Sequence, residues 1–97
     1  MKLRLRAAAV GDLDSIFEYS VEHFGVETAA AYLSDIDTAF RRLTDYPELG
    51  VRRPDLDSQI RCLQCREHCV YYSVGDKTVS VWRVLHRAMD AKRWLDA

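Results

Sequence analysis

Three cysteines and one histidine lie within eight residues, in the order Cys62-x-x-Cys65-x-x-His68-Cys69. Thiolate sulfur and imidazole nitrogen are the ligands that zinc prefers, so this spacing raises the question of a metal site. The two strands expected here turn at residues 66–67, and side chains alternate between the faces of a strand. Cys62 and Cys69 then fall on one face and Cys65 and His68 on the other. Because the four ligands cannot converge, we expect neither a metal nor a cofactor.

A second group of residues has the types that RNA cleavage needs: His86, Tyr71, Arg61 and Arg83. That reaction requires a base for the 2′-hydroxyl, an acid for the leaving oxygen and cations for the charge on phosphorus. Arg83 and His86 are three residues apart on an expected strand and so face opposite sides. No His or Tyr follows residue 86. The catalytic set is therefore incomplete, and we interpret His86 as a strand-end histidine with a structural hydrogen bond. His23 and His68 are interpreted as surface or turn residues.

The composition indicates one folded domain. With 97 residues, 48% hydrophobic and 30% charged, the chain fits a single domain over residues 1–97. Fourteen Lys and Arg against fifteen Asp and Glu give a net charge of −1, which disfavours a protein that mainly grips phosphates. No apolar run approaches the ~20 residues of a membrane span, and no signal peptide follows the basic start. We therefore expect a cytoplasmic protein with reduced cysteines.

Hydrophobic spacing predicts a strand and then two helices in the first half of the chain. Alternation over residues 2–6 favours a short strand. Apolar residues three and four apart predict an amphipathic helix over residues 10–24, with Asp12 and its acidic neighbours largely outside the apolar stripe. Gly25 ends this helix, and a second one over residues 29–43 stops before Pro47. The two helices form a hairpin.

The second half of the chain predicts three strands, over residues 60–66, 68–74 and 79–86, after a polar loop at residues 51–58. Gly75 suits a tight hairpin between the last two strands. The tail at residues 89–95 is expected to add one helical turn. The fold class is therefore α+β: an N-terminal strand, a two-helix hairpin and a three-stranded antiparallel meander.

Two packed helices about 9 Å apart cover one face of a four-stranded sheet and no more. The last strand is nevertheless apolar on both faces, with Val79, Val81 and Leu85 on one and Trp82 and Val84 on the other. Two interpretations of the uncovered face stay open. The loop, the tail and Trp94 fold over it, or a partner chain covers it. The second interpretation predicts that the isolated chain aggregates.

Charge is distributed unevenly along the chain. Residues 7–40 contain seven acidic residues and no Lys or Arg, whereas four basic and two acidic residues occur from Arg83 onward. Two solvated faces would explain this pattern. The alternative is a positive surface for an acidic partner.

Residues from both halves of the chain form an ordered set. The first half contributes Asp12-Leu13 with Ile16 and Tyr19, Gly25 with Ala29 and Tyr32, then Phe40, Leu43, Pro47 and Gly50. The second half contributes Ile60-Arg61, His68-Cys69-Val70-Tyr71-Tyr72, Trp82-Arg83-Val84-Leu85-His86, and Met89-Asp90 with Arg93. Over nearly the whole chain this set resembles the ParE branch of the ParE/RelE toxin superfamily. One departure is the cysteine cluster, where the family more often has a glycine near the hairpin.

The resemblance implies the toxin of a type II toxin–antitoxin pair, neutralised by a cognate antitoxin whose C-terminal segment wraps the toxin and covers the bare face. ParE-like members poison DNA gyrase, whereas RelE-like members cut messenger RNA on the ribosome. The net charge and the incomplete catalytic set favour a gyrase inhibitor that acts by binding, without membrane or sequence-specific nucleic-acid contacts. A ribosome-dependent endoribonuclease and a non-toxic interaction module are the alternatives. The residues expected to contact antitoxin or target are Arg61, Tyr71, Trp82, Arg83, His86, Arg87, Lys92, Arg93 and Trp94.

Overall fold

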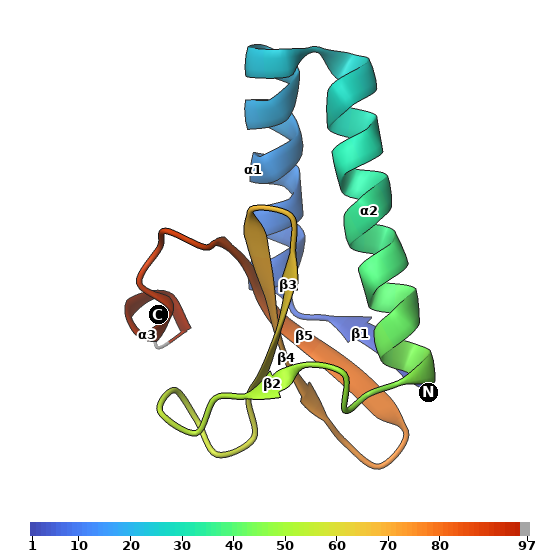
Figure 1. The fold of residues 1–97 in the computed structure, drawn as a ribbon, viewed down its shortest axis with the longest axis vertical. Coiled ribbons are helices and arrows are strands. Elements are labelled where there is room, and N and C mark those ends of the chain that lie inside the picture. Colours follow the sequence, from blue (N-terminus) through green and yellow to red (C-terminus); the bar gives the residue numbers. More distant parts are fainter. Residues whose placement is uncertain (96–97) are drawn as a thin grey trace.

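A computed structural model describes residues 1–95 as a five-stranded sheet with two long helices and one short one (Figure 1). The expected α+β fold is confirmed. In chain order the elements are β1 (Lys2–Leu5), α1 (Ala7–Phe24), α2 (Val26–Asp45), β2 (Val51–Arg52), β3 (Arg61–Cys65), β4 (His68–Val74), β5 (Thr78–His86) and α3 (Ala91–Leu95). Among these described residues, no helix is both long and apolar enough to cross a membrane.

The strand order is β1-β5-β4-β3-β2, so the first strand pairs with the last. β1 runs parallel to β5, with Leu3 beside Val79, and the other neighbours are antiparallel. The expectation of a loop over residues 51–58 was wrong at its start, because Val51 and Arg52 pair with Cys62 and Arg61. A strand of two residues is too short for an alternating pattern to reveal.

The helical hairpin turns on a single residue. Gly25 has φ 89°, a conformation that L side chains rarely adopt, and its N–H donates to the carbonyl of Val21. Both helices begin three residues earlier than the spacing predicts, at Ala7 and at Val26. In Figure 1 the connected ends of α1 and α2 extend past the sheet.

The main core lies between the helices and the sheet. Ile36, Phe40 and Leu43 of α2 are buried in it together with Val70 and Tyr72 of β4. The Tyr72 hydroxyl donates to the carbonyl of Pro47 and accepts from the N–H of Gly50, at 2.8 and 2.7 Å. These bonds hold the end of the α2–β2 connection against the sheet.

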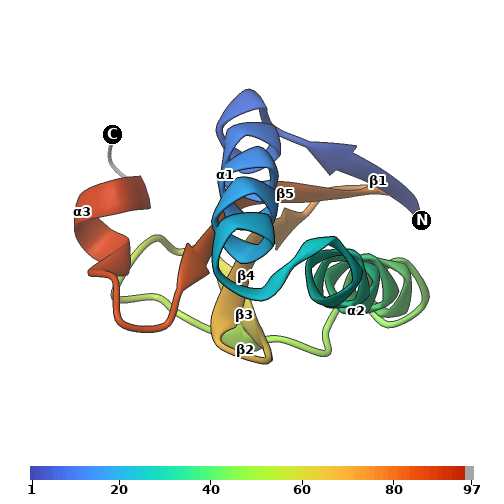
Figure 2. The same ribbon diagram turned by 90° about the horizontal axis from the view of Figure 1, so that it is seen from above.

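The chain itself covers part of the second face of the sheet, as the first of the two interpretations predicts. Ile60, Tyr71, Leu85 and Ala91 form a second buried cluster, joined by Leu56, Cys62, Cys69, Trp82, Met89 and Leu95. The loop after β2 and the predicted C-terminal helical turn supply this cover. Figure 2 places α3 on the opposite side of the sheet from α2. This arrangement removes the structural reason for predicting aggregation of the isolated chain.

A β-bulge in β5 changes which side chains face the helices. Tyr71 pairs with Arg83 and Tyr72 with Val81, which leaves Trp82 as the extra residue. Val79, Val81 and Val84 therefore belong to the main core, and Leu85 belongs to the second cluster. The prediction placed Val84 and Leu85 on the wrong faces of the sheet. It assumed that side chains alternate without interruption along β5, and the bulge breaks that alternation.

Candidate partner-binding site

The site is built around an ion pair between α1 and β5. The Nε and Nη2 atoms of Arg83 donate to the two carboxylate oxygens of Asp12, at 2.8 and 2.7 Å. The N–H of Val84 donates to the same carboxylate at 2.9 Å. Pairing between β1 and β5 ends at Val81. Beyond that residue β5 has no strand on this side, and Asp12 accepts the backbone N–H that a strand would otherwise bind. The hydrogen bonds to Asp12 raise the pKa of Arg83, which stays charged.

Arg83 also joins the C-terminal helix to this pair. Its Nη1 donates to the carbonyl of Trp94 at 2.9 Å, and its guanidinium carbon lies 5.8 Å from the centre of the Trp94 ring. Trp94 therefore lies against the edge of the site and is 40% exposed. All three nitrogens of Arg83 donate within the chain.

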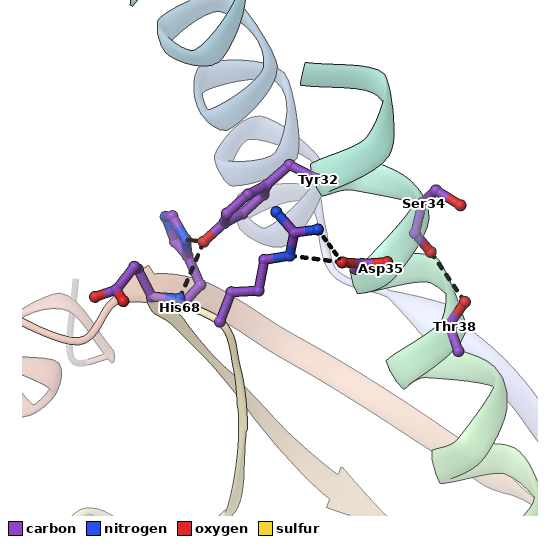
Figure 3. A network of polar contacts seen from close by, with 7 residues as sticks. Tyr32, Ser34, Asp35, Thr38 and His68 are labelled. Atoms are coloured by element: carbon purple, nitrogen blue, oxygen red, sulfur yellow. Dashed lines mark hydrogen bonds and ion pairs between the residues drawn. The ribbon is translucent and has the colours of Figure 1, made fainter. Parts of the chain in front are cut away.

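Two histidines lie side by side at the end of the sheet. His68 begins β4 directly opposite His86 at the end of β5, and their rings meet edge to face with centroids 5.3 Å apart. The half-buried His68 lies 2.5 Å, Nδ1 to Oη, from Tyr32 of α2 (Figure 3). Burial, together with the nearby His86, lowers the pKa of His68. The interpretation of His68 as an ordinary surface or turn residue was therefore wrong.

His86 has the role that its strand-end position predicts. Its Nδ1 accepts a hydrogen bond from the N–H of Ala88 at 3.0 Å. The ring is exposed on the side of the sheet that faces α1.

A groove runs along α1 beside the two histidines. It consists of two adjoining cavities of about 300 Å³ each, which share Ser15, Ile16, His68 and His86. We name it the histidine groove. Its lining is completed by Tyr19 and Ser20 at one end and by Asp12, Arg83, Val84, Leu85, Met89 and Trp94 at the other.

Three of the residues expected to contact a partner, Arg83, His86 and Trp94, line this groove. Arg87 follows His86 and forms an exposed ion pair with Glu67. Lys92 and Arg93 are exposed on α3 beside Trp94. The positive end of the sequence thus contributes Arg83, His86 and Trp94 to the groove, and its other three residues are exposed on the neighbouring segments.

The other three expected contact residues lie elsewhere. Arg61 donates to the carbonyl of Gly50 at 2.9 Å and lines a separate cavity. Tyr71 is 5% exposed in the second cluster, where burial and the neighbouring cysteines raise its pKa to about 12. Trp82 donates from Nε1 to the hydroxyl of Ser73, and the guanidinium of Arg6 lies 3.7 Å from its ring centre. These contacts give all three residues structural roles.

The strand register confirms how the cysteines divide between the faces. Cys62 lies opposite Tyr71, and Cys65 lies opposite His68. Burial next to Cys69 raises the pKa of Cys62 to about 12, so it is held as a neutral thiol. Arg66 makes the intervening turn with φ 52°, a conformation that glycine would favour. Residues 1–95 contain no cluster of three His, Cys, Asp or Glu side chains arranged to hold a metal ion.

The sequence analysis missed Asp12, His68 and Tyr32 as parts of the site. A usable signal existed for Asp12, which is three residues after the buried Ala9 and four before the buried Ile16. The predicted stripe started instead at Val10, which is exposed. His68 and Tyr32 are 36 positions apart, and no local pattern links them.

Comparison with known proteins agrees with this architecture. Residues 3–91 match the family described as the ParE toxin of the type II toxin–antitoxin system parDE. The chain is 35% identical over 92 residues to Toxin ParE1 of Caulobacter vibrioides, which covers 95% of each chain. It is 32% identical over 90 residues to Toxin ParE1 of Mycobacterium tuberculosis, which covers 92% of each.

Two solved structures share the fold. A chain of the chromosomal ParDE toxin–antitoxin system from P. aeruginosa superposes with a TM-score of 0.78 and 25% identity, over 89% of this chain and 95% of that one. A chain of the toxin–antitoxin complex RelBE2 from Mycobacterium tuberculosis superposes with a TM-score of 0.60 and 24% identity, over 91% and 92%. The two solved structures show the fold, and the family match with the relatives shows that the chain belongs to the ParE toxin family of type II toxin–antitoxin systems.

Proposed function

We propose that this ParE-family toxin arrests growth by binding DNA gyrase in the cytoplasm and is held inactive by a cognate antitoxin. Family membership supports a toxin, and both structural neighbours come from toxin–antitoxin assemblies. The P. aeruginosa neighbour therefore supports the proposal that this chain forms a hetero-oligomer with an antitoxin.

One observation favours a toxin that acts by binding its target over one that cleaves RNA. RNA cleavage would need Arg61, Tyr71, Arg83 and His86 around one phosphate. Arg83 and His86 line the same groove, contrary to the expectation that they face opposite sides, but Arg61 and Tyr71 lie elsewhere. Tyr71 is buried in the second cluster, Arg61 lines a separate cavity, and Arg83 is engaged by Asp12 and Trp94. The pKa of Tyr71 is raised to about 12, which makes it a poor base at neutral pH.

The histidine groove and the basic residues beside it are the proposed antitoxin contact. The chain's own loop and tail already cover part of the second face of the sheet, which favours the histidine groove as the place where a neutralising segment binds. Lys92 and Arg93 are exposed on α3, the helix whose Trp94 lines the groove, and they would attract an acidic segment.

The decisive experiment induces the toxin gene in cells, with and without co-expression of the candidate antitoxin gene, a short reading frame next to the toxin gene. Growth, a DNA-damage reporter and messenger RNA cleavage are measured together, with an early stop codon in the toxin gene as the control. We expect growth arrest with DNA damage and intact messages, reversed by the antitoxin. Purified toxin should inhibit gyrase supercoiling in parallel.

Each other outcome selects a different function. Message cleavage without gyrase inhibition would establish the endoribonuclease alternative. Normal growth at full toxin expression would establish a non-toxic interaction module. Growth arrest that no neighbouring gene product reverses would contradict the antitoxin part of the proposal.

A further inference from the structure

The hydrogen bonds of the two groove histidines fix which ring nitrogen carries hydrogen. The Nδ1 of His86 accepts from the backbone N–H of Ala88 at 3.0 Å. A backbone amide nitrogen only donates, so this Nδ1 presents its lone pair. The hydrogen of the neutral ring is therefore on Nε2.

The same assignment follows for His68 from two bonds at Tyr32. The Tyr32 hydroxyl oxygen accepts the N–H of Glu67 at 3.2 Å and lies 2.5 Å from Nδ1 of His68. Among the described residues Nδ1 of His68 is the acceptor bonded to this hydroxyl, and we assign the hydroxyl hydrogen to that bond. His68 then also carries its hydrogen on Nε2.

The paired rings consequently offer hydrogen-bond donors and no free lone pair. A metal ion requires the lone pair of a neutral imidazole nitrogen, and both lone pairs are occupied at Nδ1. A ligand with an acceptor oxygen is complementary instead. Both rings line the part of the groove that the two cavities share, and their centroids are 5.3 Å apart, which is close enough for a single oxyanion to contact both rings.

The charges around the groove indicate which kind of oxyanion it would bind. Arg83 is paired with Asp12, and Arg87 is paired with Glu67, so each cation is already neutralised. A phosphate dianion would meet no unpaired Lys or Arg in the lining that residues 1–95 provide, whereas a single carboxylate is satisfied by hydrogen-bond donors. Ile16, Leu85 and Met89 supply apolar wall for the group that bears the carboxylate.

We propose that the histidine groove binds an Asp or Glu carboxylate of the partner segment between the Nε2–H groups of His68 and His86. The identity of that segment as antitoxin rests on the function proposed above. The preference for a carboxylate rests on the groove alone and is tested without any partner.

The first test uses purified ¹⁵N-labelled toxin and long-range ¹H–¹⁵N correlation of the imidazole rings. At a pH where both rings are neutral, we expect Nε2–H tautomers for His68 and His86. Sodium acetate should shift both Nε2 resonances, with sodium chloride and sodium phosphate at matched ionic strength shifting them much less. An Nδ1–H tautomer at either ring, or acetate shifts no larger than those of chloride or phosphate, would overturn the inference.

The second test uses matched variants in the full complex. In His86→Gln the amide nitrogen replaces the Nε2 donor, and in His86→Asn the amide lies near Nδ1 and that donor is lost. We expect His86→Asn to weaken antitoxin binding by about tenfold and His86→Gln by no more than about twofold, since one hydrogen bond to a carboxylate is removed. Equal affinities of the two variants would overturn the inference while leaving the toxin–antitoxin pairing intact. His86 is exposed, so neither substitution should disturb folding. Equal unfolding midpoints of the two variants check this.

Discussion

Asp12 and Arg83 are 71 positions apart and form a bidentate ion pair. The Asp12 carboxylate also accepts a hydrogen bond from the N–H of Val84. The side chain of Asp12 is 13% exposed and that of Arg83 is 15% exposed. The pair lies at the edge of β5 just beyond the end of β1. It orients Arg83 so that the remaining nitrogen, Nη1, donates to the carbonyl of Trp94. Breaking it would leave a mostly buried charge without a partner.

Asp12→Ala is therefore expected to lower the free energy of unfolding by about 3 kcal/mol, the typical cost of removing one partner of a buried ion pair. Urea unfolding measures the change. Asp14→Ala on the same helix is the control, because Asp14 is exposed and should change stability by less than about 0.5 kcal/mol. Equal effects of the two substitutions would show that the ion pair contributes little.

Acid is expected to destabilise the fold through His68. Its pKa lies below the ordinary value of about 6.5, because burial and His86 outweigh the opposite effects of Glu67 and Asp12. The unfolded chain therefore takes up the proton first, and stability falls as the pH drops below about 6.5 toward the pKa of the folded state.

Urea midpoints of the wild type and His68→Gln between about pH 7.5 and about pH 5 test this dependence. The wild-type midpoint should fall more steeply than that of the variant. Parallel curves would assign the acid sensitivity to other groups.

Gly50 is expected to tolerate no side chain. A Cβ atom there would lie 2.6 Å from the Tyr72 hydroxyl and 3.0 Å from the carbonyl of Cys62. Gly50→Ala should lower the free energy of unfolding by about 2 kcal/mol, as overpacking does. Gly11→Ala is the matched control, since no neighbouring atom lies within 4 Å of its Cβ, and it should raise stability by about 0.5 kcal/mol. Thermal unfolding of both variants measures the two changes, and a neutral Gly50→Ala would contradict the close approach of Tyr72 to this backbone.

The helices, the hairpin turns and the faces of the cysteines could be predicted because local spacing determines them. Gly25 directly follows Phe24, the last apolar residue of the first helical stripe, and its φ of 89° ends α1, while alternation alone separates Cys62 from Cys65. The site could not be predicted in the same way. Its groove depends on Asp12 reaching a β5 edge that β1 has vacated, and on a bulge at Trp82 that moves Leu85 to the other face. Both features arise between segments far apart in the chain.

Lys92 and Arg93 are expected to act on association rate. Exposed charges at the rim of an interface steer an oppositely charged partner and contribute little to the bound state. Lys92→Glu with Arg93→Glu should slow association with an acidic antitoxin by about tenfold at low salt, and less at high salt. Stopped-flow measurements at several ionic strengths test this.

The control for charge reversal is Lys2→Glu with Lys77→Glu. Lys2 begins β1 and Lys77 directly precedes β5, whereas α3 follows the other end of β5. The two double variants have the same net charge, so they differ only in where the charge lies. Equal slowing by both would mean that net charge alone governs association.

Tyr32→Phe is expected to remove one hydroxyl and leave the packing of its ring intact. The ring would still contact His68 edge to face and lie 5.1 Å from the Arg66 guanidinium. The lost bonds to His68 and to the N–H of Glu67 should lower the free energy of unfolding by about 1 to 2 kcal/mol. The variant should also free the His68 ring to populate both tautomers, which imidazole ¹⁵N resonances report. Thr38→Ala, which removes an exposed hydrogen bond to Ser34 on the same helix (Figure 3), should do neither. An unchanged His68 tautomer in Tyr32→Phe would show that something other than Tyr32 sets the donor that the groove presents.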